Sequence, residues 1–269
     1  MKLQLFMSFF FLSLLCKAQE LYSVTEPASN MASRSIGFRI DNLIMNETNS
    51  STINYHLIPE IMIGVSKKLM IHGNVFFSNR SKKFRGEGGS LYGKYRFLSN
   101  DALQKHFRMA VFGRISTNNS DIHQEEISMY GHNSGFEAGV IATQLLRKVA
   151  LSSGLSFLKA LDNGNDNKYL YGSKNSTAVN YNFSIGKLML PKAYKDYRQT
   201  NINLMVEILA QVNVGSGKYY TDIAPSVQMI INSQSRVDIG YRKELSSTLL
   251  RTAPNGFFIR LEHNFFNAF

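Results

Sequence analysis

His132 and Ser134, separated by one residue, are the pair in this sequence whose types and spacing could carry out nucleophilic chemistry. Residues two apart on a β-strand point to the same side, so the His132 imidazole could deprotonate the Ser134 hydroxyl. The preceding loop contains Asp121, Glu125 and Glu126, but the sequence places none of them against His132. A chance pairing at the point where a loop enters a strand is therefore the preferred interpretation.

A larger group of charged residues occupies the parity opposite to the apolar residues of the predicted strands. If the strands close on themselves, these side chains share one interior. They then either line a polar path for a small hydrophilic or anionic solute, or pair with one another and fill the interior, which is the favoured alternative. The residues predicted to line the interior are Arg39, Asp41, Glu60, Lys94, Arg96, Arg108, Arg114, Glu137, Glu207, Asp222, Arg236, Asp238, Arg242, Arg260 and Glu262.

Two smaller groups are less informative. His56 and His72 share the inward parity on neighbouring strands, but two imidazoles without a third ligand do not define a metal site. We predict neither a metal nor another cofactor. The stretch from Arg80 to Gly89 carries four basic residues around Phe84 and could bind lipopolysaccharide phosphates, although an ordinary solvated loop explains it equally well.

These side chains must be positioned by β-strands in which apolar and polar residues alternate. From Asn201 to Val214 one parity is entirely apolar, while the other carries polar residues such as Glu207 and Gln211. Such alternation predicts a strand that lies between an apolar and a polar medium. Twelve segments follow this pattern: Ser35 to Asn46, Asn54 to Val65, Leu69 to Asn79, Ser90 to Leu98, Phe107 to Thr117, Ser134 to Leu145, Val149 to Leu161, Thr177 to Leu190, Asn201 to Val214, Thr221 to Asn232, Arg236 to Lys243 and Gly256 to Phe269.

The connections between these segments alternate between compact turns, such as Ser66 to Lys68, and longer polar loops, such as Asn118 to Asn133. Short turns on one side and long loops on the other are typical of outer-membrane barrels. Most segments also reach the roughly 9–11 residues that a tilted membrane-spanning strand needs. The sequence therefore predicts an all-β fold, a transmembrane antiparallel up-and-down barrel of about twelve strands.

The N-terminus has the features of an export signal. Lys2 precedes an apolar run that stops at Lys17, and cleavage after Ala18 is expected, so residues 1–18 are predicted to be a signal peptide. Residues 19–34 then either enter the lumen as a plug or extend in the periplasm, and residues 35–269 form the barrel. The single cysteine, Cys16, leaves with the signal, which excludes a disulfide scaffold. The basic residues are scattered, which argues against a nucleic-acid partner.

Several stretches resemble a family of outer-membrane β-barrels from Bacteroidota: Pro59 to Gly73, Tyr92 to Asp101, Phe107 to Gly113 and the mature start, Thr25 to Met31. The resemblance implies the fold and an outer-membrane location, and it implies little about function. The last segment ends on an aromatic residue, Phe269, and resembles the terminal signature by which such barrels are assembled.

These observations favour an outer-membrane, porin-like barrel of a Gram-negative bacterium that acts as a passive channel or transporter-like protein for small solutes. The first alternative is an outer-membrane lipid hydrolase that uses His132 and Ser134 on its lipid-facing wall, and the second is a structural or adhesion barrel with a filled lumen. We expect no enzyme activity. The expected partners are outer-membrane lipids, lipopolysaccharide and the barrel-assembly machinery, through the C-terminal strand ending at Phe269.

Overall fold

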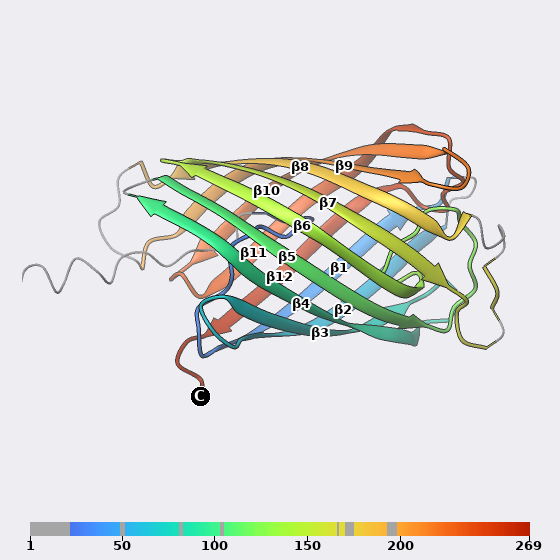
Figure 1. Cartoon of the computed structure of the whole chain (residues 1–269), viewed down its shortest axis with the longest axis horizontal. Helices are drawn as coiled ribbons and strands as arrows, with labels where there is room; N and C mark the ends of the chain where they lie inside the picture. The colour runs from blue at the N-terminus through green and yellow to red at the C-terminus, as the bar shows by residue number, and fades with distance from the viewer. Residues whose placement is uncertain are drawn as a thin grey trace, which may run out of the picture.

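The chain forms a closed barrel of twelve antiparallel strands, as seen from the side in Figure 1. A computed structural model describes residues 22–48, 52–80, 83–102, 105–165, 167–169, 175–192 and 198–269, so the predicted signal peptide lies outside the described residues. The predicted fold class is confirmed. The strands are β1 (Ser35–Asn46), β2 (Ile53–Gly64), β3 (Leu69–Ser78), β4 (Arg85–Ala102), β5 (Lys105–Asn118), β6 (Ser134–Leu146), β7 (Val149–Leu161), β8 (Thr177–Leu190), β9 (Asn201–Asn213), β10 (Tyr219–Ile231), β11 (Ser235–Ser247) and β12 (Asn255–Phe265).

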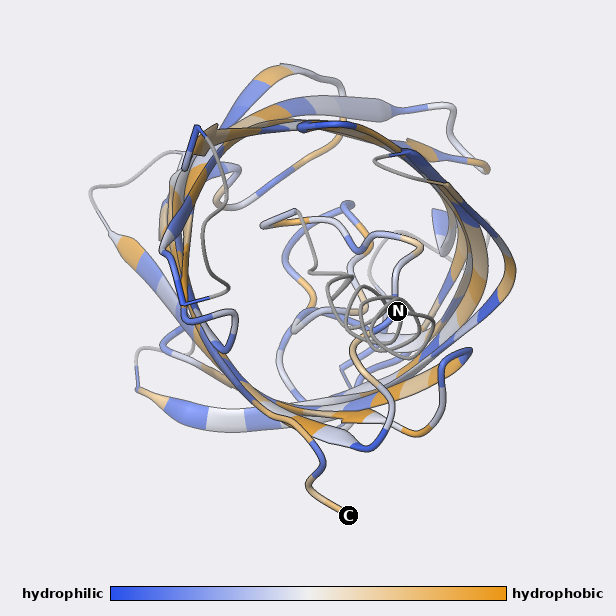
Figure 2. Cartoon of the chain, turned by 90° about the vertical axis from the view of Figure 1, so that its left-hand side faces the viewer, coloured by the Kyte–Doolittle hydropathy of each residue, from blue (hydrophilic) through white to orange (hydrophobic). Residues whose placement is uncertain are grey.

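The strands follow one another around the wall in chain order. Each pairs with its neighbours in the sequence, and β1 pairs with β12, where Arg39 lies opposite Glu262. Because this last pairing closes the ring, no strand edge is left with unpaired backbone groups. Figure 2 shows the closed ring end-on, with further chain inside it.

The two faces of the wall have the opposite character to those of a water-soluble barrel. On β9, Leu204 and Val206 are exposed, whereas Asn203, Glu207 and Gln211 are buried. The same alternation runs around the ring, and forty large apolar side chains among the described residues are exposed. The polar parity of the sequence therefore faces inward and the apolar parity faces outward.

Four predicted boundaries are wrong by four or five residues: both ends of β4, which extends to Ala102 and not Leu98, the end of β11, which lies at Ser247 and not Lys243, and the end of β12. β4 begins at Arg85, so half of the predicted loop from Arg80 to Gly89 is strand. The glycines in this stretch concealed the strand pattern. Only glycine is accommodated at position 88, because a Cβ there would lie 2.0 Å from the Thr117 carbonyl oxygen. β12 ends at Phe265, not at Phe269. Asn267 has a positive φ of 53°, and the Ala268 N–H then donates to the Arg34 carbonyl at 2.8 Å, so the chain turns away from the wall.

Two segments that are not part of the wall lie inside the barrel. One is the N-terminal segment, residues 22–34, which enters from the end that carries the compact turns (Figure 2). The other is loop 119–133, which joins β5 to β6 and folds into the opposite end. Among the described residues, no helix is long and apolar enough to cross a bilayer.

Gly88→Ala should destabilise the barrel by more than about 1 kcal/mol, because the residue has a φ of 153° and no room for a Cβ. Gly93→Ala on the same strand is the matched control, since nothing lies within 4 Å of its added Cβ. Urea unfolding in detergent micelles measures both. Equal free energies of unfolding for the two variants would contradict the close approach at Gly88.

Candidate functional site

The N-terminal segment is anchored by one carboxylate of the barrel wall. Glu207, on β9, is fully buried and accepts hydrogen bonds from the backbone N–H groups of Ser23 and Val24 at 2.9 Å and of Thr25 at 2.8 Å. It also accepts the Thr25 hydroxyl at 2.7 Å. Consecutive backbone N–H groups that converge on an anion form a strong, geometrically specific contact. Glu207 therefore fixes the position of the segment in the lumen.

Other strands hold the remainder of the segment. Lys94 of β4 donates to the Pro27 carbonyl at 2.7 Å, and the Ala28 N–H donates to the Thr143 hydroxyl of β6 at 2.9 Å. On β11, the Arg236 guanidinium donates to the Tyr22 carbonyl. Since the contacts come from strands on different sides of the ring, the segment crosses the lumen.

Glu26 joins the segment to a buried ion cluster on the wall. Arg39 pairs with Glu26 at 3.0 Å, with Glu60 at 3.1 Å and with Glu262 at 3.0 Å. Burial alone would raise the pKa of Glu26, but the nearby cations of Lys94 and Arg39 hold it well below its usual range. The carboxylate therefore stays ionised and contributes to the attachment of the segment.

Loop 119–133 is held inside the other end of the barrel by side chains of the wall and of the loop after β11. The Gln211 side chain accepts the Ile127 N–H at 2.9 Å and donates to the Ile127 carbonyl at 2.7 Å. Glu126 pairs with Arg251 at 2.7 Å and with Arg242 at 3.1 Å. Burial would raise the pKa of Glu126, but these two arginines lower it to about 2, so the ion pairs persist at neutral pH.

The prediction that His132 and Ser134 form an outward-facing pair is wrong. The His132 ring stacks on His56 inside the barrel with centroids 5.1 Å apart, and its Nδ1 accepts a hydrogen bond from Arg80 at 2.7 Å. Burial and the Arg80 cation lower the pKa of His132 well below its ordinary value. The Ser134 hydroxyl instead accepts the Asn118 N–H at 2.9 Å and donates to the Asn118 carbonyl at 3.1 Å.

The physical reason is that strand parity does not extend to these positions. His132 belongs to loop 119–133, and β6 begins at Ser134. Gly135, which follows, has a positive φ of 143°, so Ser134 and Gly135 are both buried while Phe136 is exposed. Ser134 therefore does not share the outward direction of Phe136. Arg80, predicted to face solvent, also points inward and pairs with Glu87 at 2.7 Å.

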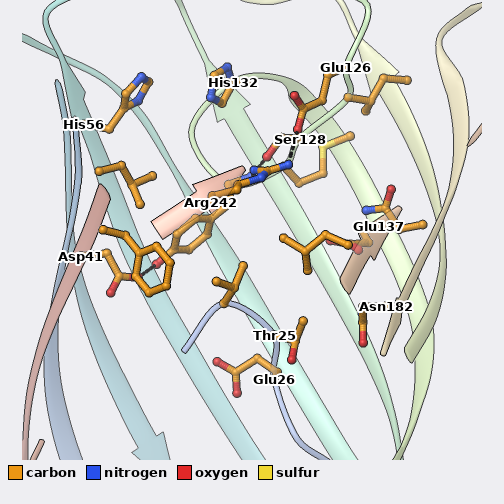
Figure 3. A pocket seen from close by; sticks show the side chains of 18 of the residues that line it. Thr25, Glu26, Asp41, His56, Glu126, Ser128, His132, Glu137, Asn182 and Arg242 are labelled. Atoms are coloured by element: carbon orange, nitrogen blue, oxygen red, sulfur yellow. Dashed lines mark hydrogen bonds and ion pairs between the residues drawn. The ribbon is translucent and has the colours of Figure 1, made fainter. Parts of the chain in front are cut away.

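Between the two inserted segments lies a cavity of about 300 Å³, which we call the chamber (Figure 3). Thr25 and Glu26 of the N-terminal segment form its floor, and Glu126 and His132 of loop 119–133 form its roof. Its walls carry both charged and apolar side chains. The wall residues include Arg39, Asp41, His56, Glu60, Tyr92, Phe112, Arg114, Glu137, Ile141, Leu158, Asn180, Asn182, Tyr220, Arg242 and Arg260.

The structure distributes the predicted interior residues over three places. Seven line the chamber: Arg39, Asp41, Glu60, Arg114, Glu137, Arg242 and Arg260. Four line a second cavity of about 410 Å³ on the other side of the N-terminal segment: Arg96, Arg108, Arg236 and Glu262. The remaining four are fully buried, with Lys94 and Glu207 bonded to the N-terminal segment, Asp238 paired with Arg236 and Asp222 paired with Arg242.

Local contacts explain the positions of Asp41, Asp222 and His72. Asp41 accepts two bonds from Arg260, at 2.6 and 2.8 Å, and Asp222 pairs with Arg242 at 2.6 Å. His72 lies 2.9 Å from Glu60. Within the described residues, no group of three or more His, Cys, Asp or Glu side chains is placed to hold a metal ion.

The sequence offered residues 19–34 as a possible lumen plug, but it did not indicate which of them would bind the wall, nor that loop 119–133 would enter the barrel. Neither the N-terminal segment nor loop 119–133 has a periodic pattern, so Ser23, Thr25 and Glu126 carried no signal. Arg251, which pairs with Glu126 and Asp222, lies in the loop after β11, and no sequence pattern identified it either. The signal that the sequence did offer was the inward parity of Glu207 and Gln211 on β9, the two side chains that bind the inserted segments.

No protein-family model matches the chain, and no curated protein is similar to it. Among solved structures, OccK11 of Pseudomonas aeruginosa is similar over 85% of this chain and 65% of its own, with 7% identity and a TM-score of 0.40. OccAB4 of Acinetobacter baumannii is similar over 83% and 56%, with 9% identity and a TM-score of 0.38. OmpT of Vibrio cholerae, expressed in the outer membrane, is similar over 88% and 100%, with 12% identity and a TM-score of 0.32. The chain thus spans less than two thirds of OccK11 and OccAB4.

Glu207→Gln should release the N-terminal segment. The substitution replaces one of the two carboxylate oxygens, which accept backbone N–H groups, with an amide NH₂ group that can only donate. A hydrogen bond to a charged group contributes about 1.5–3 kcal/mol, so the amides of Ser23, Val24 and Thr25 should exchange with deuterium roughly 10–100 times faster. Hydrogen exchange of the folded barrel measures this change.

The matched control is Glu137→Gln, which removes another lumen carboxylate, one that is partly buried and accepts a hydrogen bond from Ser156 of the wall. Its exchange at Ser23 to Thr25 should equal that of the unmodified chain. Unchanged exchange in Glu207→Gln would show that the segment is held elsewhere.

Proposed function

We propose that the chain is an outer-membrane barrel that passes small polar solutes, as a passive channel or transporter-like protein, and that the structure is its closed conformation. One observation carries this proposal: a chamber with charged walls has at each end a segment that lies inside the barrel but is not part of the wall. The wall is held by a continuous backbone ladder, whereas the two segments are held largely by side chains. Either segment can leave without breaking the barrel.

The outer surface supports a membrane location. The exposed apolar side chains run from strand to strand around the ring, including Phe38, Leu204 and Ile239. Contiguous apolar patches above a few hundred Å² are rare on proteins that face water. In a bilayer the same side chains contact hydrocarbon and the closed ring leaves no unpaired backbone groups. The family resemblance of the sequence extends this proposal to a Bacteroidota outer membrane.

The chamber suits a solute of metabolite size. Pockets for small molecules typically enclose about 300–1,000 Å³, and the chamber lies at the small end of this range. Its wall offers charged groups of both signs together with apolar side chains. A solute held there would be a small molecule with one polar end, and a folded peptide or long oligosaccharide would not fit.

A structural or adhesion barrel with a filled lumen is the second candidate. It is favoured by the density of buried ion pairs, such as Arg39 with its three carboxylates and Arg251 with Glu126, Asp222 and Glu244. The lipid hydrolase is not retained, because His132 and Ser134 bond to different partners inside the barrel. We therefore propose no catalytic residue.

The proposed partners are lipids of the outer membrane and the machinery that inserts barrels into it. Lys83 and Arg85 are exposed near the tip of the β3–β4 hairpin and could pair with lipopolysaccharide phosphates. β12 remains the strand through which assembly would begin, although it ends at Phe265.

The closed conformation predicts a specific change in ion conductance. The unmodified barrel in a planar bilayer should conduct weakly, and Glu207→Ala combined with Glu126→Gln should raise the conductance several-fold by releasing the floor and the roof. Asp121→Asn is the matched control for the loop, because this carboxylate is exposed and pairs with His123 at 3.6 Å. A folded double variant that conducts no better than the unmodified barrel would favour the structural candidate.

The membrane location predicts a depth-dependent cost of charge on the outer wall. Val206→Arg lies near the middle of β9 and should cost about 2–4 kcal/mol, whereas Val214→Arg just beyond its end should cost roughly 0–1 kcal/mol. Both side chains are exposed, so a barrel that faces water would tolerate both changes. Urea unfolding from phospholipid vesicles distinguishes the two outcomes.

A further inference from the structure

The charges that line the chamber are closely matched, with one exception. Arg260 places two donors on Asp41, at 2.6 and 2.8 Å, and Arg242 pairs with Asp222 and Glu126 at 2.6 and 3.1 Å. The exception is Arg114 of β5. Its Nε lies 3.9 Å from the Glu137 carboxylate, which is too long for a hydrogen bond.

The guanidinium of Arg114 is held in place by aromatic rings. Its central carbon lies 5.0 Å from the ring centroid of Tyr92 and 5.0 Å from that of Tyr130. Cation–π contacts of this kind stabilise the cation but leave its N–H groups free to donate. Its Nε and Nη1 are buried and have no hydrogen-bond partner among the described residues. Arg114 therefore places at the chamber wall a cation that two rings hold in position and whose buried Nε and Nη1 lack an acceptor.

Neighbouring groups do not close this gap. Glu137 lies opposite Arg114 in the strand register, but its carboxylate accepts the Ser156 hydroxyl at 2.6 Å. Buried donors of a charged group that lack an acceptor are costly, so an acceptor brought by a bound molecule would be strongly favoured. The position thus calls for an anionic or strongly accepting group from outside the chain.

The surroundings limit what that molecule can be. Besides Arg114, the chamber is lined by five carboxylates and four arginines, so its lining has no excess of positive charge for a multiply charged anion such as phosphate. The carboxylates are those of Glu26, Asp41, Glu60, Glu126 and Glu137, and the arginines are Arg39, Arg80, Arg242 and Arg260. Apolar side chains of Phe112, Ile141 and Leu158 line the same cavity. A single negative charge attached to an apolar body satisfies both constraints.

We propose that the chamber binds a small organic monocarboxylate, with its carboxylate on Arg114 and its apolar or aromatic body against Phe112, Ile141 and Leu158. The inference deepens the proposed function, on which it rests, by naming the class of solute. The chamber volume of about 300 Å³ corresponds to roughly ten water molecules, which is enough for a carboxylate on one aromatic ring.

Loop 119–133 contributes directly to this site. Tyr130, one of the two rings that hold Arg114, belongs to the loop, and its hydroxyl donates to Asp41 of β1. The site is therefore complete only while the loop is inserted. A bound carboxylate would favour the inserted loop, since both act on the same guanidinium.

The test uses the folded barrel in detergent, with 4-fluorobenzoate as the probe and 4-fluorobenzamide as its uncharged isostere, each titrated by fluorine NMR. The unmodified barrel should bind the benzoate at least roughly tenfold more tightly than the amide, as expected for hydrogen bonds to a charged group. Arg114→Gln should abolish this preference. Arg96→Gln, which lies at the second cavity, should retain it.

Absence of benzoate binding to the folded barrel, equal affinity for the two probes, or unchanged preference in Arg114→Gln would each overturn the proposal. A second variant, Tyr130→Leu, changes loop 119–133 and leaves the barrel wall intact. It should weaken benzoate binding severalfold, and unchanged binding in this variant would also contradict the proposed site. Because binding is measured without ion flow, a barrel that conducts but binds no benzoate would overturn this inference and leave the proposed function standing.

Discussion

The structure depends on one constraint: a closed barrel with an apolar exterior must place most of the charged side chains of its strands in a narrow interior. Charges in such a space need partners, because leaving one unpaired away from water costs several kcal/mol. Arg39 meets this requirement with three carboxylates, and Asp222 meets it with Arg242 and Arg251. The interior therefore takes the place of a hydrophobic core as the part of the molecule that specifies its arrangement.

The inserted segments follow from the same requirement. The partners that the structure gives Glu207 are backbone N–H groups and hydroxyls, supplied by Ser23, Val24, Thr25 and Ser184. Four of these donors, three backbone N–H groups and the Thr25 hydroxyl, belong to the N-terminal segment, so the segment supplies most of the hydrogen bonds to this charge. Gln211, four residues further along the same face of β9, binds loop 119–133 through both backbone groups of Ile127. One strand thus contacts both closures.

The sequence predicted the wall better than what fills it, because strand parity is a local property and insertion is not. The bounds of β7 and β8 match their predicted limits, since alternation and turn residues both lie within the segment. The start of β4 was missed because its glycines have low strand propensity, and the need for two of them comes from neighbouring strands: β5 approaches Gly88 and β3 approaches Gly89. His132 was assigned outward by extending the parity of β6 beyond its first residue. Nothing local could show that Ser23 would meet Glu207, 184 residues away.

The connection between Arg114 and loop 119–133 bears on how such a barrel would operate. Tyr130 contacts the guanidinium from the loop and Tyr92 contacts it from the wall, so a molecule bound at Arg114 and the inserted loop share one group. Linkage is reciprocal: a solute that binds better when Tyr130 is in place must stabilise the closed loop by the same free energy. A freely diffusing solute in an open pore has no such effect. Binding at this position therefore favours occlusion of the solute in the chamber, with release governed by departure of the loop or of the N-terminal segment, over continuous flow through an open lumen.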